Sequence, residues 1–131
     1  MNKLTLEDFT KIVVTKIKEL KNKEVILSTP KTNSIFPCTV VRTPIETINL
    51  IDQDTGEVIS KTFTVSIEEW AKSKYDVMKM MDETTEKLRK LNIIKNNNDY
   101  DGYDNVTQKY RLVSSYDVIY DGLYNCFKIK K

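Results

Sequence analysis

The sequence predicts a single α+β domain over residues 1–131, with a mixed or antiparallel sheet and helices packed on one face. Three observations predict this class. Two segments repeat apolar residues at helical spacing, other segments alternate apolar with polar residues, and 131 residues are enough for one continuous core. The expected order along the chain is helix, three strands, helix, two strands.

The first helix is expected to begin at Thr5. A threonine side chain caps free backbone N–H groups, and Asp8 would lie in the first turn, where the helix dipole favours an acid. Five apolar residues then recur at helical spacing and predict one buried stripe, formed by Phe9, Ile12, Val13, Ile17 and Leu20.

Three strands are expected next, because three prolines between residues 30 and 44 disfavour a helix. The strands are expected at 36–42, 45–51 and 58–67. The last one alternates strictly, which predicts one packed face and one solvated face. Its apolar side chains are Phe63, Val65 and Ile67, and its polar ones are Thr62, Thr64 and Ser66.

The second helix is expected to begin at Ser73, with Asp76 three residues further on as in an N-terminal cap. Its apolar side is expected to consist of Val77, Met78, Met81, Leu88 and Leu91.

The remaining chain predicts a loop followed by a hairpin. Segment 96–105 is rich in Asn, Asp and Gly and therefore favours a loop. Segment 109–120 is rich in Tyr, Val and Ile and predicts a strand. The pair Asp121 and Gly122 is typical of a two-residue type I′ turn, which leads to a last strand over 123–129.

The composition excludes the common kinds of active site. The chain has no histidine, which removes Ser-His and Cys-His nucleophiles and imidazole metal ligands, and its three glycines are too isolated for a phosphate loop. Only carboxylate chemistry stays open. We therefore expect no enzyme and no cofactor.

Charge, hydropathy and cysteine content set further expectations. The 21 basic and 19 acidic residues give a net charge of +2, which by itself indicates no polyanion partner. No apolar run has the length of a membrane span, and the N-terminus lacks the apolar stretch of a secretory signal. Cys38 and Cys126 are expected to be reduced, packed thiols in a cytoplasmic protein.

The segment after the second helix partly matches a calcium-binding loop. Oxygen-bearing residues and a glycine fall at EF-hand positions, but position 12 is Gln108, which cannot supply the bidentate carboxylate, and a strand is expected after it. A solvated loop is the simpler interpretation, and we expect no metal. The weak candidate ligands are Asn97, Asp99, Asp101 and Asn105.

An acidic turn between two expected strands is the best candidate for binding a partner. It would form the tip of a hairpin, where its residues serve either turn geometry and solubility or contact with another protein. The residues are Asp52, Gln53, Asp54, Thr55, Gly56 and Glu57.

Tyrosines in the last third of the chain favour protein contacts. They combine a large apolar area with a polar tip, and the aspartates among them would repel nucleic-acid phosphates. Nucleic-acid binding is therefore the weaker interpretation. These tyrosines are Tyr100, Tyr103, Tyr110, Tyr116, Tyr120 and Tyr124.

Five short phrases together resemble a known family. They are 36–38 (Phe-Pro-Cys), 64–70 (Thr-Val-Ser-Ile-Glu-Glu-Trp), 73–76 (Ser-Lys-Tyr-Asp), 109–111 (Lys-Tyr-Arg) and 120–122 (Tyr-Asp-Gly). In this order the chain resembles the tail terminator, or tail-completion, proteins of long-tailed bacteriophages. The resemblance covers nearly the whole chain, and the strand leading into the Ser-Lys-Tyr-Asp helix is its strongest part.

The resemblance implies a structural virion protein with no catalytic residues. Such proteins form a hexameric ring at the head-proximal end of the tail tube, stop tube polymerisation and join the tail to the head. The implied partners are further copies of this chain, the tail tube protein, the head–tail connector protein and, in contractile tails, the sheath protein. DNA would only pass through the ring, and assembly would take place in the cytoplasm of the bacterial host. The alternative is a calcium-binding or small regulatory protein-binding module of a mobile element.

Overall fold

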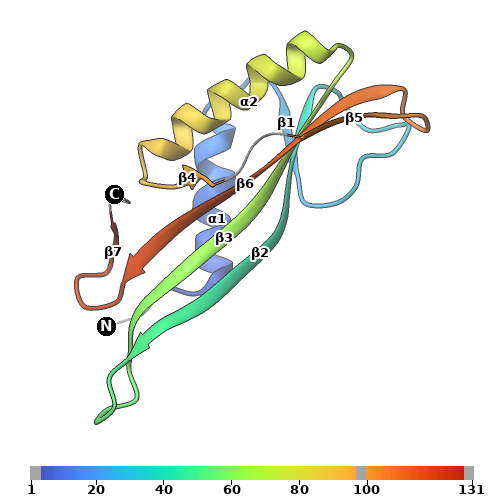
Figure 1. Cartoon of the computed structure of the whole chain (residues 1–131). Helices are drawn as coiled ribbons and strands as arrows, with labels where there is room; N and C mark the ends of the chain where they lie inside the picture. Colours follow the sequence, from blue (N-terminus) through green and yellow to red (C-terminus); the bar gives the residue numbers. More distant parts are fainter. Residues whose placement is uncertain (1–3, 97–99, 129–131) are drawn as a thin grey trace.

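A mixed sheet with both helices on one face forms the fold in the computed structural model, which describes residues 4–96 and 100–128 (Figure 1). This confirms the predicted α+β class. Within these residues the elements are α1 (Leu6–Lys18), β1 (Glu24–Ile26), β2 (Cys38–Ile51), β3 (Val58–Ala71), α2 (Lys74–Arg89), β4 (Ile94–Lys95), β5 (Tyr100–Asp104), β6 (Lys109–Asp121) and β7 (Cys126–Lys128).

Three long strands, β2, β3 and β6, form the centre of the sheet. They pair antiparallel in the order β2-β3-β6, and β1 joins the outer edge of β2 in parallel. The outer edge of β6 is paired by β5, β4 and β7 in succession. By contrast, β1 pairs only with residues 38–40 of β2. No described strand pairs with the outer edge of β2 beyond residue 40.

Both helices begin where the sequence predicts. The Thr5 hydroxyl accepts a hydrogen bond from the Asp8 backbone N–H at 3.1 Å, and the Asp8 carboxylate accepts one from the Thr5 N–H at 3.0 Å. The Ser73 hydroxyl accepts from the Asp76 N–H at 3.1 Å. Neither helix that the structure describes is long and apolar enough to cross a bilayer.

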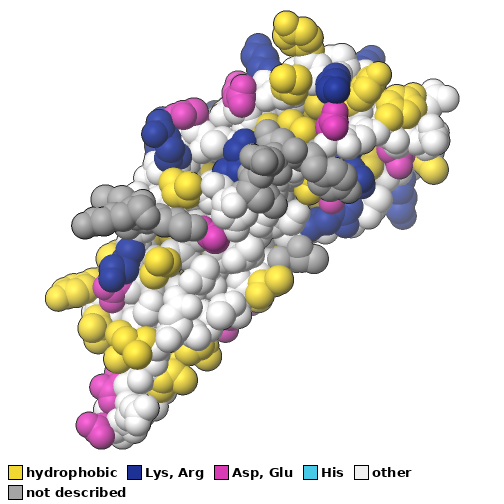
Figure 2. All heavy atoms as spheres, in the orientation of Figure 1, with side chains coloured by type: hydrophobic (Ala, Val, Ile, Leu, Met, Phe, Trp, Pro, Cys, Tyr) yellow, Lys and Arg dark blue, Asp and Glu magenta, His cyan; other side chains and the backbone are white. Residues whose placement is uncertain are grey.

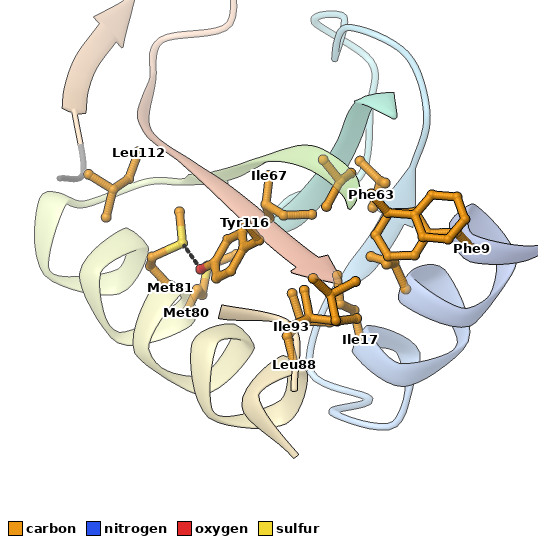
Figure 3. Packing of buried hydrophobic residues seen from close by; sticks show 14 of the residues in the cluster. Phe9, Ile17, Phe63, Ile67, Met80, Met81, Leu88, Ile93, Leu112 and Tyr116 are labelled. Atoms are coloured by element: carbon orange, nitrogen blue, oxygen red, sulfur yellow. Dashed lines mark hydrogen bonds between the residues drawn. The ribbon is translucent and has the colours of Figure 1, made fainter. Parts of the chain in front are cut away.

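The main core lies between the two helices and the sheet (Figure 3). Phe9 of α1 stacks on Phe63 of β3 with ring centroids 4.6 Å apart. The Tyr116 hydroxyl of β6 lies 3.0 Å from the sulfur of Met81 and 2.7 Å from the Thr85 hydroxyl, so its polar end is satisfied inside the core.

The apolar side of α2 differs by one residue from the expectation. Met80 is buried with its neighbours Val77, Met81 and Leu88, whereas Met78 is 52% exposed. Met78 follows Val77 by one residue, a rotation of about 100° around the helix, which turns it away from the sheet. Its assignment to the core was wrong.

A buried ion pair joins three elements on the helix side of the sheet. The Lys23 ammonium lies 2.9 Å from Oε1 of Glu69 on β3, and the two side chains are 1% and 0% exposed. The ammonium also donates to the Thr84 hydroxyl of α2 at 2.7 Å, and that hydroxyl donates to Oε2 of Glu69 at 2.6 Å. The Thr39 hydroxyl of β2 donates to Glu69 as well.

A second, smaller core lies on the other face of the sheet, where the alternation had predicted solvent. It consists of Cys38, Val40 and Trp70, against which Phe36 packs. The Trp70 indole N–H donates to the Glu68 carboxylate at 3.0 Å, so its polar atom is also satisfied. This cluster is confined to one end of the sheet.

Several element boundaries were predicted wrongly. The strands expected at 36–42 and 45–51 are one strand, β2, which begins at Cys38 and has a register shift between Arg42 and Ile45 that accommodates Pro44. The expected loop 96–105 contains β5, which pairs with β6. The structure therefore has four described strands after α2 where two were expected, and β1 was not foreseen.

The turn after β6 also differs from the prediction. It spans residues 122–125, and the residue with positive φ is Asn125, at 53°. The Asp121 carboxylate accepts hydrogen bonds from the backbone N–H groups of Leu123 at 2.8 Å and Tyr124 at 3.2 Å. This side-chain hydrogen bonding favours a longer turn than the two-residue type I′ form.

Candidate protein-binding hairpin

The β2–β3 hairpin extends past the helical layer (Figure 1). Each of its strands has 14 residues, which corresponds to about 46 Å at the usual rise of a strand. The helices have 13 and 16 residues, or about 20 and 24 Å. Helices of this length cannot cover the whole hairpin, so its far part projects from the domain. We call residues 45–60 the arm; residues 45–47 form its root and pair with 62–64 inside the sheet.

The arm begins where the aromatic core ends. The Lys61 ammonium lies 5.0 Å from the ring centroid of Phe63 and 5.8 Å from that of Tyr120, and it forms an ion pair with Glu46 at 3.1 Å. Lys61 therefore covers the edge of the core with its aliphatic stem and its charge. From Ile45 to Ile51, every residue of the outer strand is exposed.

The outer strand of the arm exposes four aliphatic side chains. Ile45 lies opposite Thr64 and Ile48 opposite Lys61, which places them on different faces of the sheet. Covering a whole Leu or Ile side chain stabilises a protein by about 1.5–3 kcal/mol, and roughly half of each side chain is still available here. The exposed fractions are 54% for Ile45, 51% for Ile48, 55% for Leu50 and 44% for Ile51.

The tip of the arm is a turn organised by one carboxylate. Oδ1 of Asp52 accepts hydrogen bonds from the backbone N–H groups of Asp54 at 2.8 Å and Thr55 at 3.1 Å. Gly56 follows with φ of 73°, a conformation that side chains disfavour, and its N–H donates to the Asp52 carbonyl at 2.8 Å. Asp52 therefore shapes the turn.

The rest of the tip presents negative charge to solvent. Asp54 and Glu57 are exposed and form no ion pair with any residue that the structure describes. No basic residue occurs in the sequence between Arg42 and Lys61. Figure 2 shows acidic side chains and no basic ones at the tip. The structure thus brings the six predicted partner-binding residues together as an acidic turn at the end of an apolar edge.

The described part of the calcium-like segment consists of strand β5 and the turn 105–108 that follows it. Asp101 lies on β5 and forms an ion pair with Lys74 at 2.9 Å; the hydrogen bond and charge of Lys74 lower the pKa of Asp101. Asn105 begins the following turn, and Asn97 and Asp99 lie outside the described residues. Alternate residues of a strand are about 6.6 Å apart, whereas calcium ligands converge on one point. In the described part of the chain, no three His, Cys, Asp or Glu residues gather as metal ligands would.

The acidic residue of the turn between β5 and β6 accepts hydrogen bonds from within the turn. The Asp104 carboxylate accepts hydrogen bonds from the backbone N–H and the hydroxyl of Thr107, both at 2.8 Å. These two bonds, the backbone one first, lower the pKa of Asp104. Gln108, expected at the twelfth EF-hand position, has φ of 58° and ends this turn.

The two thiols lie in different environments. Cys38 is buried, and burial, followed by the charges of Glu69, Glu24 and Glu68, raises its pKa to about 12. It is therefore a protonated, unreactive thiol at neutral pH. Cys126 is free but exposed on β7, so its assignment as a packed residue was wrong.

A second exposed apolar region, at the start of α2, was not predicted from the sequence. Tyr75 and Met78 are both exposed there, at the end of the sheet opposite the arm (Figure 1). Tyr103 and Val106, in the β5–β6 hairpin at the same end, are also exposed. One sequence feature could have identified Met78 as exposed: it lies off the helix face that residues 77, 81 and 88 share.

The sequence matches no protein-family model, and a search of curated proteins finds no significant match.

Proposed function

We propose that this chain is a tail terminator of a long-tailed bacteriophage and that the arm is its main contact surface. In this role it forms a ring on the head-proximal end of the tail tube, stops tube polymerisation and presents a surface to the head connector. The observation that carries the proposal is the arm itself, a projecting ribbon with exposed Ile45, Ile48, Leu50 and Ile51 and an acidic tip. The sequence resemblance supports it.

The outer edge of β2 has the properties of a binding surface. An unpaired strand edge offers N–H and C=O groups for strand addition, and exposed aliphatic side chains beside it lose water when a partner binds. An apolar centre with a charged rim is the usual composition of a protein interface. The apolar edge and the acidic tip of the arm match these two parts.

A terminator has to satisfy one further condition. A growing tube end exposes a repeated surface that recruits the next ring of subunits. The terminator has to occupy that surface while offering no copy of it on its own far side. The arm projects from one end of the domain only, so the opposite end can present a surface that differs from the arm (Figure 1). In this proposal the protein is assembled in the host cytoplasm and remains in the virion, with DNA passing through the ring.

Electron microscopy of phage carrying an altered arm tests the proposal. Replacing residues 52–57 by a two-residue turn should preserve the fold, since these residues belong to no core cluster. We expect overlong tubes and unattached heads. A matched surface variant, Lys18→Glu with Lys90→Glu, changes exposed residues at the C-terminal ends of α1 and α2 and should give normal tails.

Two results would contradict the proposal at different levels. Normal tail lengths and full head joining with the shortened turn would remove the arm tip from the mechanism. Normal virions in the complete absence of this chain would remove the tail terminator assignment itself. Circular dichroism and thermal unfolding of the purified variant establish that it is folded.

A further inference from the structure

The arm carries only negative charge. Residues 45–60 include Glu46, Asp52, Asp54 and Glu57 and no basic residue. Glu46 is neutralised by Lys61 at the root of the arm, which leaves the three acids of the tip.

The opposite end of the sheet carries the complementary charge. Segments 31–37, 72–79 and 101–111 lie there and contain six basic and three acidic residues, a net charge of +3. Lys31, Lys72 and Lys79 are exposed and have no ion-pair partner within residues 4–96 and 100–128. The N-terminal end of the α2 dipole adds positive potential. Figure 2 shows several basic side chains at this end.

A cleft of about 400 Å³ opens at this basic end, between the segment before β2 and the start of α2. Phe36, Ala71 and Met80 give it an apolar part, while Lys72 and Lys79 line it together with Asp76 and Glu83. The acids make the cleft itself neutral, so the attraction for an acidic partner comes from the whole end. Tyr75 and Met78 are also exposed in the first turns of α2.

We propose that the arm tip of one copy docks at the α2 end of the next copy, with Asp54 and Glu57 facing Lys72 and Lys79. This inference rests on the proposed function, because a ring requires two different surfaces on each subunit. Charge complementarity selects a second copy as the occupant. A two-fold contact between arms would instead bring two acidic tips together, which like-charge repulsion disfavours.

Charge reversal tests the contact by sedimentation of the full-length protein at low ionic strength. The tip variant is Asp54→Lys with Glu57→Lys, and the end variant is Lys72→Glu with Lys79→Glu. Each should weaken self-association by about tenfold or more, and their combination should restore it to within about threefold of the original. Raising salt from about 0.05 to about 0.5 M should weaken the original contact as well. The control, Lys18→Glu with Lys90→Glu, should have little effect; equal weakening by the control, or no recovery in the combination, would overturn the proposal.

Cysteine cross-linking in the presence of tail tube ends tests the direction of the contact. In a Cys126→Ser background, one chain carries Asp54→Cys and another carries Lys79→Cys. Links between the two different chains are expected, and links between two Asp54→Cys chains alone, or no links, would overturn head-to-tail docking. If the head-to-tail links form but tail length is unaffected, the docking contact is supported and the proposed role in the tail is refuted. If tails terminate normally but the tip is cross-linked to a different site, the proposed role in the tail is supported and the docking contact is refuted.

Discussion

The buried ion pair between Lys23 and Glu69 provides the sharpest stability prediction. Lys23→Met would leave the Glu69 carboxylate buried without its cation, although the Thr39 and Thr84 hydroxyls would still donate to it. Removing one partner of a buried pair costs about 3–5 kcal/mol. A domain of this size has a free energy of unfolding of about 5–15 kcal/mol, so the loss is a large part of the total.

Urea unfolding at neutral pH measures this loss. With a slope of about 2 kcal/mol per molar urea, the midpoint should fall by roughly 2 M. Adding Glu69→Gln removes the uncompensated charge and should recover at least about 1 kcal/mol relative to Lys23→Met alone. The control is Lys11→Met, which breaks the Lys11–Glu7 pair on the surface, where both side chains are mostly exposed; its midpoint should not move.

A small effect of Lys23→Met would contradict this expectation. If Lys23→Met lowers the free energy of unfolding by less than about 1 kcal/mol, the Glu69 carboxylate is not held in a desolvated site. The same conclusion follows if Glu69→Gln makes the Lys23→Met variant less stable instead of more stable.

Three further predictions concern the candidate sites. Calcium should leave the thermal midpoint unchanged, and a calorimetric signal abolished by Asp99→Ala with Asp101→Ala would contradict this. A maleimide should label Cys126 in the folded protein and leave Cys38 unmodified, because the pKa of Cys38 is about 12; mass spectrometry of the labelled peptides decides. The turn hydrogen bonds lower the pKa of Asp104 below its ordinary 3.8, so its contribution to stability is present above that pH and is lost as the pH falls through the lowered value. Asp104→Asn should therefore flatten the acid side of the stability–pH curve.

The helix starts and the long strands could be predicted because their signals are local. A capping residue such as Thr5 or Ser73 acts within one turn, and the alternation in β3 reflects a single packed face. β5 could not be predicted in this way. Its residues Asp101 and Gly102 favour a loop in isolation, but pairing with Leu112 and Arg111 of β6 supplies the hydrogen bonds of a strand.

The position of the candidate site could be predicted from the sequence, but its exposed apolar residues could not. The turn residues between two strands located the tip of the hairpin. The exposure of Ile48 and Leu50 could not be predicted, because apolar residues in a strand ordinarily indicate a core. Their exposure depends on where α1 and α2 end in space, and this is a property of the packed domain.

The stacking of Phe9 on Phe63 has a mechanical consequence for the arm. A two-stranded ribbon is marginally stable in isolation, so its stiffness has to come from where it is anchored. The arm is anchored at one end only, at Lys61 and the aromatic rings next to it. A force applied at the tip is therefore transmitted to that root. The stack of Phe9 on Phe63 ties α1 to the root that receives this force.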